Sequence, residues 1–291
     1  MEKIGQLIRT WLIKFWIPLL ITIVMVGVAV AITTTLLFKQ QITVHIPNIP
    51  LREQRGVTSP KLSVLKAGEH LQILDKKYGW YQVRRQDEST GWVAGWLVER
   101  NKPVAHMSPL AEATVVLDPG HGGNDTGAIS NNGKFEKTYT LRLARLVAKE
   151  LRRQGTRVIM TRNSDRIVYL AKIPLVSERA HADMSISFHF DSAPESNVAS
   201  GYTAYYYHKK NHSNELAKAI NQAMAPNLNM PNKGVEFGNF LVIRDNTLPS
   251  VLLENGYINS DADFKRIKSE TVQKQIAKDV AKGINNYLKA Q

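Results

Sequence analysis

The fold of the larger part of this chain is decided by the stretch Thr114-Val115-Val116-Leu117-Asp118-Pro119-Gly120-His121-Gly122-Gly123. Its first four residues have the character of a buried strand, and Pro119 with the following glycines must end that strand. A histidine is thereby placed on a glycine-rich turn directly after a strand. The sequence predicts a strand end that carries a reactive side chain.

Strands and helices alternate after this turn. Alternation of this kind predicts a three-layer α/β domain with a mixed sheet, which we expect over residues 113–291. We expect helices over 135–154 and 213–224, strands over 157–161, 184–189, 201–207 and 250–253, and a closing helix whose apolar stripe runs from Val272 to Leu288.

Four polar residues fall at or beside the ends of these elements, namely His121, Glu136, His189 and Glu254. Chemistry in α/β folds is placed at the ends of parallel strands. Two imidazoles and one carboxylate form a common catalytic zinc set, and a second carboxylate can move the proton. Spacing alone leaves other roles open: structural histidines, an acid favoured by a helix dipole at Glu136, and a buried salt-bridge partner at Glu254.

Composition narrows the chemistry further. The 291 residues include 43% hydrophobic and 22% charged residues, which is the balance of a globular protein with about two folded units. The absence of cysteine excludes disulfides, thiolate zinc sites and cysteine nucleophiles, so a metal must be held by His and carboxylate. The formal charge of +13 favours a polyanionic neighbour.

Residues 15–38 contain no charged side chain and are long enough to cross a bilayer as a helix. Three basic residues precede this segment and only Lys39 follows closely, which predicts a cytoplasmic N-terminus over residues 1–14. The alternative is a signal peptide cleaved after Ala29-Val30-Ala31. In both cases the C-terminal part is exported, where wall polymers or lipid headgroups are anionic neighbours and nucleic acid is excluded.

Residues 42–101 carry short strand-like runs separated by turn glycines, which predicts a small antiparallel barrel. The pairs Gly79-Trp80, Gly91-Trp92 and Gly95-Trp96 make this segment resemble the bacterial SH3-like (SH3b) domain. The resemblance implies binding to peptidoglycan peptides or to a protein partner, although the tryptophans can also be core residues. Residues 102–112, with two prolines, are expected to be a linker.

Five ordered blocks resemble the zinc-dependent N-acetylmuramoyl-L-alanine amidases of the amidase-3 type. They lie at 117–123, 135–137, 161–165, 187–191 and 251–259. The resemblance implies that His121, Glu136 and His189 bind Zn²⁺ and that Glu254 is catalytic. Asp118, Arg162 and Asp191 are candidates for orienting these ligands or the substrate. Phe190 and Asn255 depart from the usual residues, which bears on substrate fit and not on metal binding.

The order of span, SH3b domain and amidase is similar to that of the membrane-anchored LytH-type amidases of staphylococci. It implies a single-pass membrane protein whose outward domain cuts the amide between N-acetylmuramic acid and L-alanine of peptidoglycan. Anionic wall polymers and an activating membrane protein are further expected partners. The alternatives are a zinc peptidase that cuts within the stem peptide, and a wall-binding or partner-regulating protein with weak activity.

Overall fold

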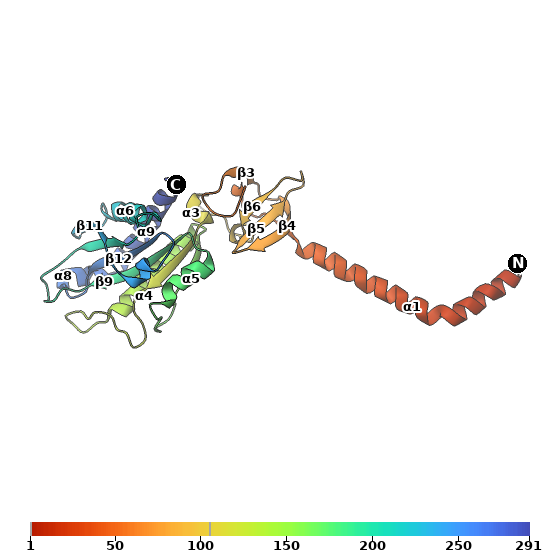
Figure 1. The fold of residues 1–291 in the computed structure, drawn as a ribbon, viewed down its shortest axis with the longest axis horizontal. Coiled ribbons are helices and arrows are strands. Elements are labelled where there is room, and N and C mark those ends of the chain that lie inside the picture. Colours follow the sequence, from red (N-terminus) through yellow and green to blue (C-terminus); the bar gives the residue numbers. More distant parts are fainter. Residues whose placement is uncertain (1, 105) are drawn as a thin grey trace.

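The computed structural model describes residues 2–104 and 106–291. The first element, α1 (Glu2–Lys39), is a helix of 38 residues that extends away from two folded units (Figure 1). Its apolar part, Ile13–Thr35, has a mean hydropathy of 2.6, and none of it is buried within the protein. Pro18 lies inside α1 and cannot donate a backbone hydrogen bond, which accounts for the bend seen in Figure 1. The length and composition of α1 allow a membrane span.

The first folded unit is an antiparallel sheet in the order β1-β4-β5-β6-β2-β3. It follows α1 after a single residue and closes around a core that includes Trp80, which is 5% exposed. Trp80 packs edge-on against Trp96 with ring centroids 5.8 Å apart, so both tryptophans serve the packing of the module. The strands are β1 (Gln41–Thr43), β2 (Ile49–Arg52), β3 (Lys61–Leu65), β4 (His70–Lys77), β5 (Trp80–Arg84) and β6 (Thr90–Ala94), followed by α2 (Gly95–Val98).

The second unit contains a six-stranded sheet in the order β11-β10-β12-β9-β7-β8. β10 and β12 are antiparallel and the other neighbours are parallel, so the sheet is mixed. The strands are β7 (Thr114–Pro119), β8 (Arg157–Met160), β9 (Met184–Asp191), β10 (Tyr202–Tyr206), β11 (Asn232–Phe237) and β12 (Ser250–Tyr257).

Helices cover both faces of this sheet (Figure 1). α4, α6 and α9 pack on one face around the main core, and α5 and α7 cover the other face. This arrangement confirms the predicted three-layer α/β fold. The helices are α3 (Pro109–Glu112), α4 (Glu136–Arg153), α5 (Lys172–Ala180), α6 (Ser213–Met224), α7 (Leu241–Arg244), α8 (Asp261–Ile267) and α9 (Glu270–Lys289).

Several elements differ from the sequence-based expectation. The edge strand β11 has the polar sequence NKGVEF. Apolar and polar residues alternate too weakly in this sequence to indicate a strand. The helix α5 was missed because Pro174 lies near its start, where proline is tolerated. β9 and β12 continue two and four residues beyond the predicted runs, through Asp191 and Tyr257.

The two folded units are held together through α3, inside the segment expected as a linker. Leu110 belongs to the main core of the second unit, whereas Ala111 belongs to the core of the β module. Across the same junction, Arg52 Nε lies 2.6 Å from Glu112 Oε2, and the two residues are 8% and 1% exposed. The Trp96 indole donates to the carbonyl of Ala111 at 3.0 Å. These contacts fix the β module against the α/β unit.

Replacing Glu112 with Gln tests this junction. The change leaves the buried Arg52 guanidinium without its counter-charge, so the free energy of unfolding should fall by about 3 kcal/mol. Urea unfolding of the full-length protein in detergent, followed by tryptophan fluorescence, measures it. The matched control is Glu88→Gln, because Glu88 pairs with Arg84 at 3.5 Å on the surface with its side chain 80% exposed. That variant should lose less than about 1 kcal/mol, and equal losses in the two variants would contradict the buried junction.

Candidate active site

The parallel strands β7, β9 and β12 bring the predicted site residues to one edge of the sheet. In the register of β9 and β12, His189 lies directly opposite Glu254. Phe188 and Leu253 point into the main core, so the two-residue period of a strand turns His189 and Glu254 to the other face. Two residues that are far apart in the chain are thereby cross-strand neighbours.

His121 is presented by the glycine-rich turn that follows β7. Gly120 N donates to the carbonyl of Phe188 at 3.0 Å, which fastens the turn to β9. His121 itself has φ of 63°, a left-handed conformation that a non-glycine residue adopts at a cost. Its Nδ1 lies 2.9 Å from Asp125 Oδ2, which fixes the ring and turns Nε2 toward Glu136. Asp125 was not predicted, because this contact depends on the left-handed turn.

Glu136 begins α4 and lies between the two imidazoles. Its Oε2 is 3.0 Å from His121 Nε2, and its Oε1 is 3.1 Å from His189 Nδ1. The backbone N–H groups of Ala128 and Phe190 donate to the same two oxygens at 2.9 and 3.0 Å. The Glu136 side chain is 4% exposed. The unusual Phe190 therefore contributes through its backbone, while its side chain lies in the core.

These three side chains could hold a divalent metal ion. One ligand atom from each of His121, Glu136 and His189 lies within 4.8 Å of the others. Burial alone would lower the pKa of His121, but Glu136 and Asp125 outweigh it and raise the pKa to about 9. Burial would raise the pKa of Glu136, and the two imidazoles reverse this and hold it well below its usual range. The buried negative charge of Glu136 thus favours a positive charge between these side chains, which suits a cation, and metal binding would displace a proton from His121.

Two glycines keep the space around the three side chains free. A Cβ at Gly120 would overlap the ring of His189. A Cβ at Gly127, where φ is +65°, would come within 2.5 Å of Glu136 Oε2 and 2.6 Å of His121 Cδ2. Only glycine fits at either position, because the ligand side chains occupy the volume that a methyl group would need.

Glu254 stands beside the three ligand candidates as an unpaired carboxyl. Its Oε2 is buried and has no hydrogen-bond partner in the part of the chain that the structure describes. Burial, together with the nearby charges of Glu136 and Asp191, raises the pKa of Glu254 well above its usual value. A carboxyl with a raised pKa is suited to accept a proton and return it during a reaction.

The other three predicted residues have separate environments. Asp118 is buried and accepts hydrogen bonds from the hydroxyls of Thr161 and Ser187 at 2.6 and 2.7 Å. Arg162 is 1% exposed, and its guanidinium donates to backbone carbonyls, including those of Pro119 and Gly120, both at 2.9 Å. It therefore fastens the turn that carries the first histidine. The carboxylate of Asp191 accepts from the next backbone amide at 2.8 Å and is not a member of the cluster of three ligand candidates.

A hollow of about 330 Å³ opens beside His121 and His189. The end of β7 and its turn line one part of it, and the apolar segment 167–170 lines another together with Ile173 of α5 and Val242 of α7. Tyr169 and Leu170 are 64% and 57% exposed at this wall. The hollow can therefore take a substrate with both polar and apolar parts next to the two imidazoles.

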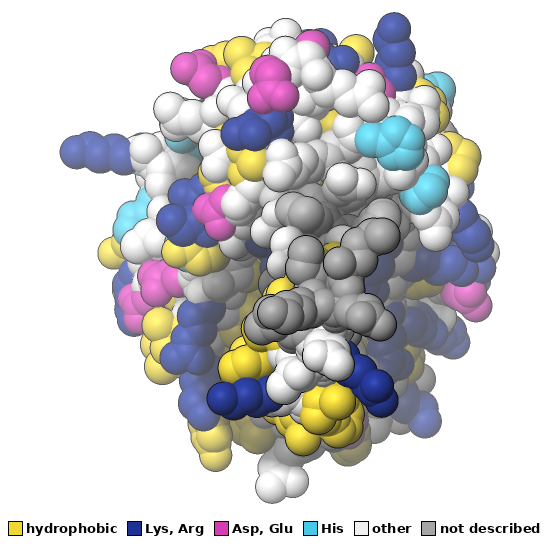
Figure 2. Space-filling view, turned by 90° about the vertical axis from the view of Figure 1, so that its right-hand side faces the viewer, with side chains coloured by type: hydrophobic (Ala, Val, Ile, Leu, Met, Phe, Trp, Pro, Cys, Tyr) yellow, Lys and Arg dark blue, Asp and Glu magenta, His cyan; other side chains and the backbone are white. Residues whose placement is uncertain are grey.

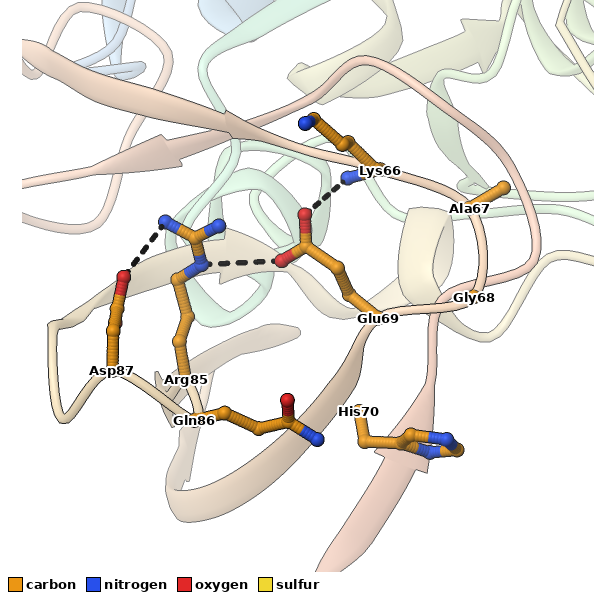
Figure 3. A pocket seen from close by; sticks show the side chains of 8 residues that line it. All are labelled: Lys66, Ala67, Gly68, Glu69, His70, Arg85, Gln86 and Asp87. Carbon is orange, nitrogen blue, oxygen red and sulfur yellow. Dashed lines mark hydrogen bonds and ion pairs between the residues drawn. The ribbon is translucent and has the colours of Figure 1, made fainter.

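A separate hollow of about 540 Å³ lies on the β module, between the turns that precede β4 and β6 (Figure 3). Three of its charged side chains, those of Glu69, Arg85 and Asp87, are paired with one another. Glu69 accepts from the Lys66 backbone at 2.7 Å and pairs with Arg85 at 3.1 Å, while Arg85 also lies 3.6 Å from Asp87. It brings together no set of groups suited to hydrolysis, and a ligand for the module stays a prediction.

Comparison with known proteins agrees with this geometry. The model of the N-acetylmuramoyl-L-alanine amidase family matches residues 115–286, and the model of the bacterial SH3 domain matches residues 47–99. The chain is 34% identical over 254 residues to a probable cell wall amidase LytH of Staphylococcus epidermidis, covering 85% of this chain and 84% of that protein. The chain therefore belongs to the N-acetylmuramoyl-L-alanine amidase family, within the group of cell wall amidases that resemble LytH.

Solved structures lead to the same family. An N-acetylmuramoyl-L-alanine amidase from Clostridium difficile 630 superimposes with a TM-score of 0.60 and 29% identity, over 62% of this chain and 98% of that one. The CwlD amidase from Clostridioides difficile, solved in complex with the GerS lipoprotein, gives 0.56 and 26% over 62% of this chain and all of that one. Both similarities show that the α/β unit has the fold of a peptidoglycan amidase.

Gly120→Ala tests whether this geometry is what holds a metal. The added methyl group displaces the His189 ring, so the affinity for Zn²⁺ should fall at least about tenfold. Competition with a fluorescent chelator measures it, and circular dichroism reports the fold. Gly133→Ala is the control, because a Cβ at Gly133 meets nothing within 4 Å, although φ is +74° there. Unchanged affinity in the Gly120 variant would show that His189 is not a ligand.

Proposed function

We propose that this protein is a zinc-dependent amidase that hydrolyses the bond between the lactyl group of N-acetylmuramic acid and L-alanine. The observation that carries the proposal is the meeting of His121, Glu136 and His189 within 4.8 Å, with the unpaired Glu254 beside them. Two imidazoles and one carboxylate are a donor set of catalytic zinc sites. When bound, Zn²⁺ supplies the Lewis acidity that activates water and polarises the amide carbonyl.

The protein's own residues transfer the proton and position the metal ligands. Glu254 takes the proton of the attacking water and returns it to the leaving nitrogen of L-alanine, since its raised pKa suits both steps. Asp125 keeps the proton on His121 Nδ1, which leaves Nε2 free as a ligand. Arg162 and Asp118 hold the β7 turn and the strands behind it. Asp191 acts through its charge, which adds to the effect of burial in raising the pKa of Glu254.

We further infer that α1 anchors the enzyme with residues 15–38 in the membrane, residues 1–14 in the cytoplasm and the folded units outside. The basic residues before the apolar segment support this orientation. Viewed from the α1 end, Lys and Arg side chains are spread over the face of the molecule (Figure 2). They favour contact with an anionic envelope. The module over 42–101 and the amidase over 113–291 then act on peptidoglycan near the membrane, where a membrane protein could switch the enzyme on.

Glu254→Gln separates catalysis from metal binding. Without the carboxylate that moves the proton, the rate should fall about 10²–10⁴-fold, while bound zinc stays unchanged. The assay uses the full-length protein with defined glycan strands and mass spectrometry of the products. Wild type should release stem peptides that begin with L-alanine, and chelation followed by added Zn²⁺ should abolish and restore this. Cuts within the stem would identify a peptidase, and full activity in Glu254→Gln would refute the role of Glu254.

The topology can be measured by cysteine labelling, because the natural chain has no cysteine. The single replacements Gln6→Cys and Gln291→Cys place a thiol on each side of α1. A membrane-impermeant maleimide applied to intact cells should label only the Gln291→Cys variant, and permeabilised cells should allow labelling of both variants. Loss of the Gln6 segment from the mature protein would instead show a cleaved signal peptide, and labelling at both ends in intact cells would exclude the proposed orientation.

A further inference from the structure

Three arginines line a groove on the α/β unit that shares no lining residue with the hollow beside His121 and His189. The groove has a volume of about 450 Å³ and lies between α4 and the free edge of β8. We call it the arginine groove and define it by Arg145, Arg152, Met160, Asn163 and Arg166. None of these residues is acidic. The amidase mechanism uses none of their side chains.

Each of the three guanidinium groups is fixed by a hydrogen bond to the backbone. Arg145 Nη2 donates to the carbonyl of Asn163, Arg152 Nη2 to Val158 at 3.2 Å, and Arg166 Nη2 to Thr161 at 3.0 Å. In every case the bond uses only Nη2. The Nε and Nη1 groups of all three have no hydrogen-bond partner among residues 2–104 and 106–291. The groove therefore presents oriented donors that are free to bind a ligand.

The positive charges of the groove are not neutralised within the described chain. Arg145, Arg152 and Arg166 form no ion pair with any described carboxylate. The neighbouring Asp165 is engaged by Lys137 at 2.8 Å and by the Gly123 amide at 2.8 Å. The three guanidinium groups therefore have no carboxylate partner in the part of the chain that the structure describes. An anionic ligand would supply the missing counter-charge.

We propose that the arginine groove binds a linear phosphodiester polymer. Arg145 and Arg152 are two helical turns apart, about 10 Å along the axis of α4, so a repeated charge matches them better than a single ion. The free oxygens of a phosphodiester fit the paired donors of a guanidinium. Its charges lie on the polymer backbone itself, whereas an acidic peptide would have to order flexible side chains to present them.

The placement of the groove favours a polymer over a lipid surface. The β module lies between α1 and the α/β unit, so the groove is separated from the membrane end of the molecule by a whole folded unit (Figure 1). The negative charge that pairs with the groove is then expected from a polymer of the cell envelope outside the membrane. Binding there would hold the catalytic unit along the polymer through side chains that are not ligand candidates for the metal.

The experiment measures binding of a fluorescent glycerol-phosphate oligomer to the full-length protein in neutral phosphatidylcholine nanodiscs. In the triple variant Arg145→Gln/Arg152→Gln/Arg166→Gln, affinity should fall at least about tenfold, and the slope of log affinity against log salt should fall by about 2. The matched control is Lys209→Gln/Lys210→Gln/Lys218→Gln, which removes three exposed charges that form no ion pair in the described chain. It should change affinity less than about twofold, because distant charges are screened.

A second variant distinguishes a specific loss of binding from a loss of folding. Replacing the same three arginines with Lys keeps the charge but removes the paired donors, so its affinity should lie between wild type and the Gln variant. Circular dichroism confirms that each variant is folded. Equal binding by all variants would overturn the proposal. It would also be overturned if polyglutamate, or vesicles of phosphatidylglycerol, competed for the groove as well as the oligomer does.

Discussion

The carboxylate of Glu136, held between the imidazoles of His121 and His189, is the constraint on which the rest of the site depends. It is nearly fully buried, and burial of a charge is costly unless it is paired and hydrogen-bonded. Both of its oxygens are satisfied, each by one imidazole and one backbone amide. Three segments of the chain must therefore arrive at the same point: the turn after β7, the start of α4 and the end of β9. Arg162 helps by fastening the turn after β7 through its hydrogen bonds to Pro119 and Gly120. Gly120 helps because it has no side chain, which leaves room for the His189 ring.

A second buried ion pair fixes the catalytic unit relative to the rest of the molecule. The buried pair of Arg52 and Glu112 and the packing of α3 attach the β module firmly to the catalytic unit. The β module follows α1 after one residue. The catalytic unit is therefore connected to α1 through a folded module and not through a long flexible linker. The arginine groove adds a second, independent contact with the envelope on the catalytic unit itself. In this account, placement of the enzyme and cleavage by the enzyme depend on different residues.

Much of this could be predicted from the sequence, because the decisive residues follow strong local signals. His121 lies on a glycine-rich turn after an apolar strand, Glu254 ends an apolar run, and their order along the chain resembles a known family. Glu136 could not be assigned from its position alone, since an acid at a helix start has ordinary reasons to be there. Asp125 and the backbone of Phe190 were missed because their roles exist only after the turn and strand meet. The arginine groove was missed because the sequence of α4 alone indicates only that its basic residues face solvent. Only the fold places the edge strand β8 beside Arg145 and Arg152.

The central claim is that His121, Glu136 and His189 together bind one zinc ion. Anomalous diffraction at the zinc edge, from crystals of the protein grown with Zn²⁺, tests it most directly. The account predicts one strong peak with two imidazole nitrogens and an oxygen of Glu136 at about 2.0–2.2 Å. A peak coordinated by other residues, or no peak at this position in protein that hydrolyses peptidoglycan at its full rate, would contradict it.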